Sequence, residues 1–305
     1  MKTSTLLAMG LLSFLIGCGS KTGKYNKKDG EWHYKKISLH ESSSEPLTFL
    51  GAGFAKTRKW AYWEGWSVPG ADVESFVGLS DHYAKDKDHA FWCDTYRDSK
   101  EYWSIQHLRS IKMDVDAASF HNLDERYAKD NNSMYYEGVA FGVADVATYT
   151  ILDAGFAKDK VHGYFARQPI MESDGTTFAS IGGDFSKDAK HVFYSGGMTP
   201  DEKLGRPRGV YVLKDANPAT FTLLESNYAT DSGRVYYAGK LLETEATSFR
   251  VLQYDYGVSG SHVYYRGVLL KGADPATFEI VTLVDSGPTA KDKINTYSFD
   301  KRLKK

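Results

Sequence analysis

Pairs of adjacent aromatic residues recur along the chain at a fixed distance after a polar residue, which we name the anchor. The residue five positions after the anchor is aromatic in all nine copies, and the residue six positions after it is aromatic in seven. The usual distance between anchors is about 29 residues, as from Thr57 to Asp86. This period is typical of a tandem repeat architecture. The anchors are Asp29, Thr57, Asp86, Asp130, Asp159, Asp188, Asp231, Ser259 and Asp292.

Each copy predicts short strands joined by tight turns. Val235-Tyr236-Tyr237 is typical of a strand. Because adjacent strand residues face opposite ways, one ring should enter its own unit and the other should pack on a neighbour. The anchor carboxylate suits a turn, since it can accept backbone N–H bonds. Between anchors, Asp274-Pro275 predicts a cap and one helical turn that crosses to the next strand.

These features predict an all-β fold, a tandem array of short antiparallel units of about 29 residues with one-turn helical crossings. One unit cannot bury both aromatic faces, so neighbouring units must stack. The first and last copies carry Lys35 and Ser298 at the second aromatic position. Polar residues there would cap the ends, which favours an open array. The alternative is a closed, β-propeller-like ring, whose blades usually need ~40 or more residues.

Residues 1–17 are typical of a secretory signal peptide. Lys2 precedes an apolar stretch, Leu6–Ile16, that is too short to span a bilayer, which needs ~20 apolar residues. Leu15-Ile16-Gly17-Cys18 resembles the lipobox of bacterial lipoproteins. The resemblance implies that the Cys18 thiol takes a diacylglyceryl group, that cleavage precedes Cys18, and that the new amine is acylated, for example with palmitate. Gly19 instead of aspartate implies, by similarity to enterobacterial sorting, the outer membrane, facing the periplasm or the cell surface.

The charge balance bears on nucleic-acid binding, and the cysteine content bears on whether disulfide bonds stabilise the fold. The 38 Lys and Arg residues nearly balance the 39 Asp and Glu residues, which gives no basis for nucleic-acid binding. Once Cys18 is acylated, Cys93 is the only cysteine left, so packing and not a disulfide must hold the fold. We expect Cys93 to be a small apolar core residue or an unpaired thiol.

The repeat resembles that of the DKNYY family of bacterial secreted and lipid-anchored proteins. The matching segments include Tyr127-Ala128-Lys129-Asp130-Asn131, Tyr135-Tyr136-Glu137-Gly138 and Gly272-Ala273-Asp274-Pro275-Ala276-Thr277-Phe278. The resemblance implies a repeat domain over residues 25–299, between a lipidated tether, 18–24, and a basic, solvated tail, 300–305. Thr57 and Ser259 depart from it at the anchor position. It implies fold and location, and it brings no activity and no catalytic residue.

Motifs for catalysis, cofactors and metals are absent from the sequence, so we expect no enzyme activity, no cofactor and no metal site. His-Glu-x-x-His, Cys-x-x-Cys and Gly-x-Ser-x-Gly do not occur. The acidic turns lack the ligand spacing of a calcium loop. Four histidines recur in one repeat position, where they should form a ladder and not converge on a metal. They are His89, His162, His191 and His262.

Two insertions lengthen the period to 44 residues after Asp86 and 43 after Asp188. Residues 94–111 are rich in Tyr, Trp and Arg, and residues 195–209 contain several Gly, Pro and Arg. Loops on a repeat scaffold often carry binding specificity. A tryptophan-rich strand adds a possible exposed ligand face, on which Trp60 and Trp66 would lie with Tyr62. The candidate contact residues are Trp60, Trp66, Tyr96, Tyr102, Trp103, Arg206 and Arg208.

The leading hypothesis is a non-enzymatic cell-envelope lipoprotein. It would be held in the membrane by its N-terminal lipid and would bind an envelope protein or glycan through its repeat surface and inserted loops. One alternative is an enzyme such as an envelope glycan hydrolase, which would need paired carboxylates ~5–10 Å apart in a cleft. A purely structural spacer is the other alternative.

Overall fold

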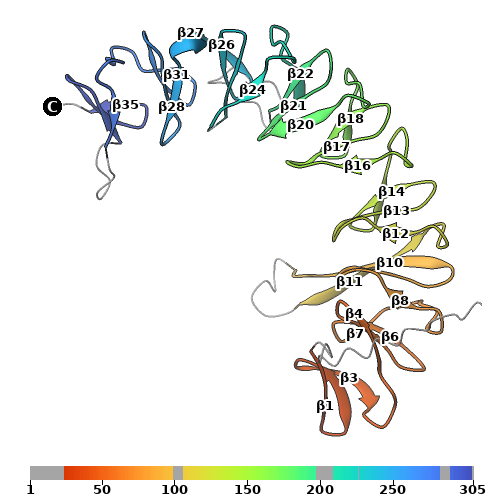
Figure 1. The fold of residues 1–305 in the computed structure, drawn as a ribbon. Coiled ribbons are helices and arrows are strands. Elements are labelled where there is room, and N and C mark those ends of the chain that lie inside the picture. The colour runs from red at the N-terminus through yellow and green to blue at the C-terminus, as the bar shows by residue number, and fades with distance from the viewer. Residues whose placement is uncertain (1–23, 99–105, 197–208, 226, 282–288, 304–305) are drawn as a thin grey trace, which may run out of the picture. The chain divides into compact units, whose positions relative to one another are not determined.

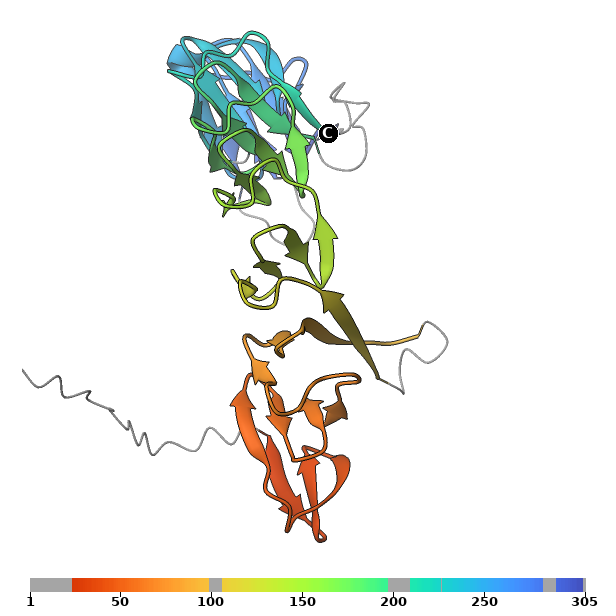
Figure 2. The same cartoon turned by 90° about the vertical axis from the view of Figure 1, so that its right-hand side faces the viewer.

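The computed structural model describes residues 24–98, 106–196, 209–225, 227–281 and 289–303. These residues form nine small antiparallel sheets, which follow one another in chain order (Figures 1 and 2). The chain divides into two compact units, up to Ala140 and from Phe141 onward. We number the sheets as repeats 1 to 9, of which repeats 1–4 belong to the first unit and repeats 5–9 to the second.

Repeats 1 to 4 are built from strands that pair in sequence order. They are repeat 1, β1 (Tyr25–Lys28), β2 (Glu31–Tyr34) and β3 (Ile37–Ser42); repeat 2, β4 (Thr48–Gly51), β5 (Phe54–Lys56), β6 (Ala61–Trp63) and β7 (Trp66–Ser67); repeat 3, β8 (Val77–Gly78), β9 (Tyr83–Lys85), β10 (His89–Tyr96) and β11 (His107–Asp114); and repeat 4, β12 (His121–Asn122), β13 (Tyr127–Lys129), β14 (Met134–Tyr136) and β15 (Val139–Phe141).

Repeats 5 to 9 have the same strand order. They are repeat 5, β16 (Thr150–Ile151), β17 (Phe156–Lys158), β18 (Gly163–Phe165) and β19 (Gln168–Ile170); repeat 6, β20 (Ala179–Gly182), β21 (Phe185–Lys187), β22 (Val192–Ser195) and β23 (Val210–Val212); repeat 7, β24 (Thr222–Leu223), β25 (Tyr228–Asp231), β26 (Arg234–Tyr237) and β27 (Lys240–Glu245); repeat 8, β28 (Arg250–Leu252), β29 (Tyr256–Val258), β30 (Val263–Tyr265) and β31 (Val268–Leu269); and repeat 9, β32 (Glu279–Ile280), β33 (Ala290–Lys291), β34 (Thr296–Ser298) and β35 (Lys301–Leu303).

This architecture confirms the predicted all-β array of nine antiparallel units. None of the sheets formed by the described residues closes into a barrel. The crossing between repeats is a hydrogen-bonded turn in most copies, as where Thr277 N–H donates to the Asp274 carbonyl at 3.3 Å. Within the described part of the chain, helical geometry occurs only as the 3-10 turn Ala246–Ser248. A tight turn is sufficient because the next strand starts two or three residues later.

Within each unit, a ladder of aromatic rings joins each repeat to the next. Three residues before the anchor stands another aromatic, which we name the leading aromatic; in repeat 3 it is Tyr83. The Tyr83 ring lies 4.8 Å from Trp92 in its own repeat and 5.8 Å from Phe120 at the start of repeat 4. Phe120 in turn lies 5.7 Å from Tyr135. Because these rings are buried and mostly edge-to-face, they supply the core that a single thin sheet lacks.

The second aromatic of one repeat packs directly on a tight turn of the next. Trp92 of repeat 3 is buried under the turn Glu137–Gly138 of repeat 4. Gly138 has a φ of +78°, and a Cβ there would lie 2.6 Å from the Cβ of Trp92. The turn therefore needs glycine for its backbone conformation and for the close approach of the neighbouring ring.

Repeat 1 follows a frame that is shifted by one residue from the sequence prediction. Lys28 pairs with Glu31 around a two-residue turn, Asp29–Gly30, and Tyr25 pairs with Tyr34 as Tyr83 pairs with Trp92 in repeat 3. Tyr34 is therefore the second aromatic of repeat 1, and Asp29 is an exposed turn residue and not an anchor. The prediction that Lys35 takes the second aromatic position as a cap was wrong. The physical reason is that Asp-Gly strongly favours the centre of a hairpin turn.

The last repeat extends further than expected. Lys301–Leu303 forms β35, which pairs with β34, so these residues are part of the sheet and not a solvated tail. Ser298 stands in the second aromatic position, as expected for a cap. Thr289 stands in the leading aromatic position, where its hydroxyl accepts the N–H of Phe299 at 2.8 Å. Repeat 9 therefore lacks both rings that the other repeats direct at a following neighbour.

The first insertion is an extended hairpin and not an irregular loop. β10 and β11 pair from His89 opposite Asp114 to Tyr96 opposite His107. The Asp94 carboxylate accepts a bond from Arg109 Nε at 2.7 Å across this hairpin. Residues 99–105, within this insertion, and residues 197–208, within the second, lie outside the described residues.

Candidate functional site

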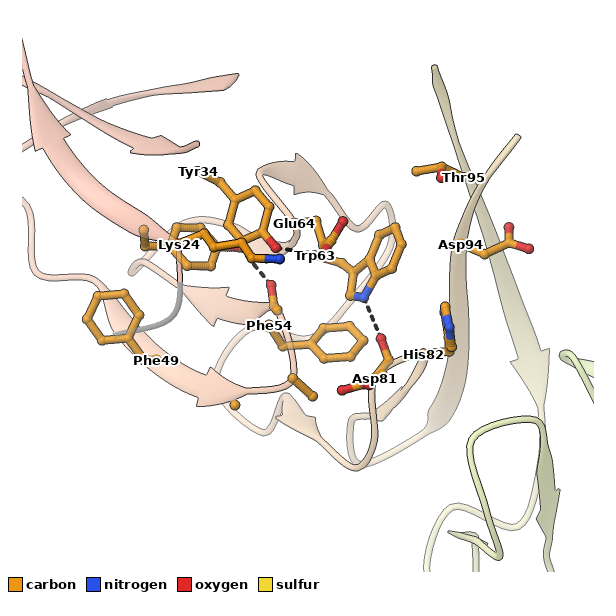
Figure 3. A pocket seen from close by; sticks show the side chains of 14 residues that line it. Lys24, Tyr34, Phe49, Phe54, Trp63, Glu64, Asp81, His82, Asp94 and Thr95 are labelled. Carbon is orange, nitrogen blue, oxygen red and sulfur yellow. Dashed lines mark hydrogen bonds between the residues drawn. The ribbon is translucent and has the colours of Figure 1, made fainter. Parts of the chain in front are cut away.

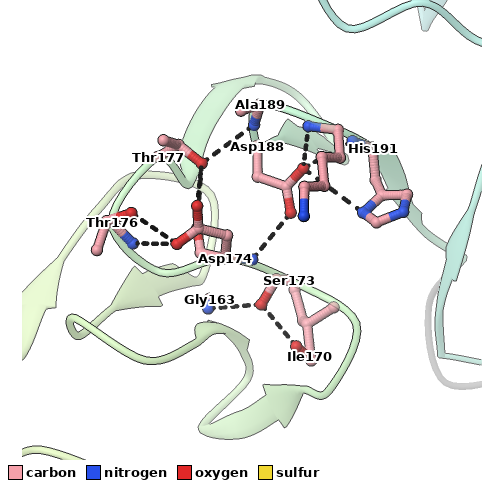
Figure 4. Close-up of polar contacts among 10 residues, drawn as sticks. Gly163, Ile170, Ser173, Asp174, Thr176, Thr177, Asp188, Ala189 and His191 are labelled. Atoms are coloured by element: carbon pink, nitrogen blue, oxygen red, sulfur yellow. Dashed lines mark hydrogen bonds and ion pairs between the residues drawn. The ribbon is translucent and has the colours of Figure 1, made fainter.

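In the six repeats that have an aspartate anchor, the buried carboxylate holds the turns of the repeat together. In repeat 6, one oxygen of Asp188 accepts the backbone N–H groups of Lys190 at 2.7 Å and His191 at 2.6 Å (Figure 4). The other oxygen accepts the N–H of Asp174 at 2.9 Å. The Asp174 carboxylate accepts the Thr177 hydroxyl at 3.0 Å, which shows how the acidic residue before each sheet is tied to the anchor. These acids are therefore used in folding.

The pKa values of these carboxyls reflect the same bonds. Burial alone would raise the pKa of Asp188, but backbone N–H donors outweigh it and lower the pKa. At Asp292 the same balance of burial against backbone N–H groups and the Tyr297 hydroxyl brings the pKa to about 2. Where the anchor is a hydroxyl, one half of the pattern remains: Thr57 Oγ1 accepts the N–H of Trp60 at 3.2 Å. The anchors thus have a structural role.

Two of the four recurring histidines lie beside an anchor carboxylate. His89 Nδ1 lies 3.7 Å from Asp86, and His191 Nδ1 lies 3.6 Å from Asp188. Among the described residues, no group of three or more His, Cys, Asp or Glu side chains is placed to hold a metal ion.

Cys93 is a buried free thiol in β10, as expected. Its Sγ lies 3.8 Å from the hydroxyl of Ser110 on the paired strand. Burial raises its pKa to about 12, so the reactive thiolate is scarce at neutral pH.

A groove of about 500 Å³ crosses one edge of repeats 1, 2 and 3 (Figure 3). Residues from the same repeat position line it, each directly before a leading aromatic: Lys24, Gly53 and His82. We name this the pre-aromatic position. Because equivalent residues of consecutive repeats fall on one edge, the groove runs along the array.

The floor of the groove is aromatic, and its lining includes three acidic residues, Glu64, Asp81 and Asp94, and one lysine, Lys24. Trp63 is buried, and its indole N–H donates to the Asp81 carbonyl at 2.7 Å. The Tyr34 hydroxyl donates to Glu64 at 2.5 Å. Asp81 is exposed beside Trp63 (Figure 3).

The first insertion forms the end wall of this groove. Asp94 and Thr95 belong to the part of β10 that extends beyond the usual hairpin, and both line the groove. In repeat 2 a two-residue turn, Glu64–Gly65, closes the same hairpin directly after Trp63. The extension therefore gives repeat 3 a raised edge that repeat 2 lacks.

The residues singled out from the sequence are only partly brought together. Trp60 is 52% exposed and Tyr96 is 49% exposed, the latter with its ring 5.4 Å from His107. Trp66 lies on β7 opposite Trp63, and Tyr62 pairs with Ser67. Since paired residues share a face, Trp66 faces away from Tyr62, and the single aromatic face predicted for Trp60, Tyr62 and Trp66 does not form. Outside the described residues lie Cys18, Tyr102, Trp103, Arg206 and Arg208.

Sequence reasoning missed the groove residues Gly53, Glu64 and Asp81. They belong to no motif, and each looks like an ordinary turn residue when read alone. A comparison of pre-aromatic and turn positions would have marked Glu64, because two of its charged counterparts, Glu137 and Arg266, each have an oppositely charged partner in the pre-aromatic position of their own repeat.

A second hollow, of about 370 Å³, lies in repeats 5 and 6. It is lined mainly by apolar residues of β18, β19 and β23, with Met171 71% exposed at its margin. It lies beside the second insertion, and its lining holds a single charged side chain, that of Glu172.

The fold defines a tandem β-repeat protein. Most polar residues that recur in its repeats have a structural role. A model of the DKNYY family matches residues 93–168 and 237–301. The two matched regions cover parts of repeats 3–5 and 7–9, and these parts of the chain therefore carry the DKNYY-type repeat. Neither a curated protein nor a solved structure matches the chain. Across the described residues, no helix is long and apolar enough to cross a membrane.

Proposed function

We propose that this protein is a lipid-anchored module of the bacterial cell envelope that binds a partner without catalysing a reaction. The observation that carries the proposal is the groove of repeats 1–3 with its raised β10–β11 wall. Most repeat positions are occupied in holding the array together, whereas this wall departs from the repeat and borders an open cavity. Departures of this kind are where a repeat scaffold gains specificity.

The anchoring half of the proposal rests on the lipobox-like segment before Cys18. Several acyl chains give stable attachment because each buried CH₂ contributes ~0.8 kcal/mol. From Cys18 to Lys24 is six residues, so an extended tether would keep the groove within roughly 20 Å of the lipid surface. An outer-membrane location is the expected one.

Lipid labelling tests the anchor. Cys18→Ser should abolish incorporation of labelled palmitate and release the protein from membranes, whereas Cys93→Ser should leave both unchanged. Membrane retention of the Cys18→Ser variant would refute the anchor.

Site-specific cross-linking in intact cells tests the binding role. A photoreactive phenylalanine analogue at Tyr96, on the exposed hairpin, should capture a discrete partner. The same analogue at Met171, in the second unit, is the matched control. Replacing residues 93–110 by Glu-Gly would recreate the Trp63-Glu64-Gly65-Trp66 turn as Trp92-Glu-Gly-Ile111. Because this removes position 96, its effect is measured with the analogue at Ala52, an exposed groove residue, where the product should be lost. Absence of any product specific to Tyr96 would favour the structural spacer.

One observation favours an enzyme as the second candidate. Glu64, Asp81 and Asp94 all line the groove, and paired carboxylates are what a glycan hydrolase needs. Against it, Asp94 is engaged by Arg109 and Glu64 accepts the Tyr34 hydroxyl. Release of sugars from purified envelope glycan by the wild type, lost in Glu64→Gln and Asp81→Asn, would establish the enzyme and overturn the proposal.

A further inference from the structure

We propose that the groove of repeats 1–3 binds the guanidinium or ammonium group of an arginine or lysine side chain on an extended partner peptide, with Glu64 as its principal counter-ion. This rests on the proposed binding function and names the class of partner.

Other repeats contain an internal ion pair at the equivalent place. In repeat 4, Arg126 in the pre-aromatic position lies 3.4 Å from Glu137, the first residue of the turn. In repeat 8 the charges are exchanged, and Asp255 lies 2.8 Å from Arg266. In these two repeats the pre-aromatic position and the turn therefore meet at the same edge and carry opposite charges, whereas repeats 5 to 7 have no charged residue at the first position of the turn.

Repeat 2 keeps the acid and lacks the base. Its turn residue is Glu64, the counterpart of Glu137, but its pre-aromatic residue is Gly53. A Cβ at Gly53 would lie 3.1 Å from Glu64 Cγ, so a side chain there would point at the carboxylate. With glycine, that place is part of the groove. A cationic side chain from a partner could occupy it as Arg126 does in repeat 4.

Nearby charges leave the groove acidic. Arg109 neutralises Asp94, but the described residues place no Lys or Arg nitrogen within 4.0 Å of the carboxylates of Glu64 or Asp81. Lys24 lines the groove and forms no such pair. The pKa of Tyr34 is raised chiefly by burial, and further by its bond to Glu64 and by the negative charges of Glu64 and Asp81.

The aromatic floor suits the same ligand. Tyr34, Phe54 and Trp63 line the groove beneath these carboxylates. Guanidinium and ammonium groups are attracted to aromatic faces, and their methylene stems pack on apolar surface. Because residues from three successive repeats contribute, an extended peptide fits the groove better than a compact ligand.

The test uses the full mature chain with Cys18→Ser and two short peptides that differ at one position. One peptide carries arginine between glycine and serine residues, and the other carries citrulline, which is neutral and nearly isosteric. Calorimetry should show that the arginine peptide binds about tenfold more tightly or better, as expected for a charge-assisted hydrogen bond. Equal affinity for the two peptides, or no binding of the arginine peptide at millimolar concentration, would overturn the proposal.

Variants locate the effect. Glu64→Gln should weaken arginine-peptide binding about tenfold, and Glu137→Gln, whose acid already has Arg126, should leave it unchanged. Gly53→Arg should abolish binding by filling the cation position from within. Gly53→Asn is the control for backbone strain, because Asn227 occupies the same position of repeat 7 at a φ of 65°. Undiminished binding by a folded Gly53→Arg variant would refute the assignment even if Glu64→Gln failed to fold.

Failure of this inference can be told apart from failure of the proposed function. If the Tyr96 cross-link forms in cells but the two peptides bind alike, the binding module stands and the cationic ligand is wrong. If neither the cross-link nor peptide binding occurs, both are wrong.

Discussion

Replacing Gly138 by alanine should destabilise the contact between repeats 3 and 4 far more than the same substitution at Gly30. The two glycines have nearly the same backbone conformation, with φ of +78° and +79°. At Gly30 an added Cβ meets no atom within 4 Å, whereas at Gly138 it would lie 2.6 Å from Trp92 Cβ and 3.0 Å from its Cγ. The pair therefore separates backbone strain from packing between repeats.

The magnitudes follow from these two contributions. Alanine in a left-handed conformation costs roughly 1 kcal/mol, which applies to both variants. Overpacking in a tight contact adds ~1–3 kcal/mol, which applies only to Gly138→Ala. We expect a loss of about 1 kcal/mol for Gly30→Ala and about 2–4 kcal/mol for Gly138→Ala.

Hydrogen exchange is the suitable assay because a stacked array can open locally. Amides of β10 and β14 should lose protection in Gly138→Ala and keep it in Gly30→Ala. Urea denaturation followed by tryptophan fluorescence gives the overall loss. Combining Gly138→Ala with Trp92→Gly should recover part of the sum of the single effects, because glycine removes both the Cβ and the Cγ that the added methyl group would meet. Equal losses for the two glycine variants would refute the view that the second aromatic is packed against the next turn.

Three further results are expected. The pKa of Asp292, held at about 2 against an ordinary ~3.9, should make unfolding free energy fall by roughly 2 kcal/mol as the pH drops from about 5 to 2, and Asp292→Asn should flatten this acid limb in denaturant titrations. Cys93, with its pKa near 12, should resist iodoacetamide at pH 8 until urea unfolds the chain, as mass spectrometry would show. Tyr228→Phe should cost ~1–3 kcal/mol of unfolding free energy, because its hydroxyl links the Asp255 carbonyl at 3.1 Å and the Gly267 N–H at 3.3 Å.

The repeat architecture was predictable because its causes are local. A strand needs alternating side chains, and a turn needs an acid or glycine at a fixed offset, so both leave a period in the chain. The opposite directions of Tyr236 and Tyr237 follow from strand geometry alone. The contacts that a ring makes in the neighbouring repeat could not be predicted in this way, because they depend on how the repeats stack.

The frame of repeat 1 could not be settled by counting from an aspartate. Lys28-Asp29-Gly30 offers two positions for the turn, and His33-Tyr34 offers an aromatic for either choice. The pairing of Tyr25 with Tyr34 decides between them. This pairing involves the leading aromatic, and counting forward from the anchor does not use that position.

The groove escaped the sequence for a different physical reason. The chemistry of the groove depends on the lack of a side chain at Gly53, next to the carboxylate of Glu64. A sequence motif is defined by the residues that are present, so it does not mark a missing side chain. Only the spatial adjacency of two positions that are eleven residues apart, visible in the Arg126–Glu137 pair, gives Gly53 a meaning.

Departures from the repeat thus have different consequences according to the contact that they remove. Thr289 and Ser298 stand where other repeats have rings that pack on a neighbour, and the buried Thr289 hydroxyl instead accepts the N–H of Phe299 within its own repeat. Lys36 stands where repeat 4 has Gly138, so a neighbour stacked on repeat 1 in the same way would meet a side chain where contact allows none. Gly53 instead leaves Glu64 without the basic partner that Arg126 gives to Glu137 in repeat 4. Where a ring is missing, less apolar surface needs to be covered by a neighbouring repeat. Where a counter-ion is missing, a charge remains that a binding partner can neutralise. Glu64, which has no counter-ion among the described residues, is therefore the better guide to binding.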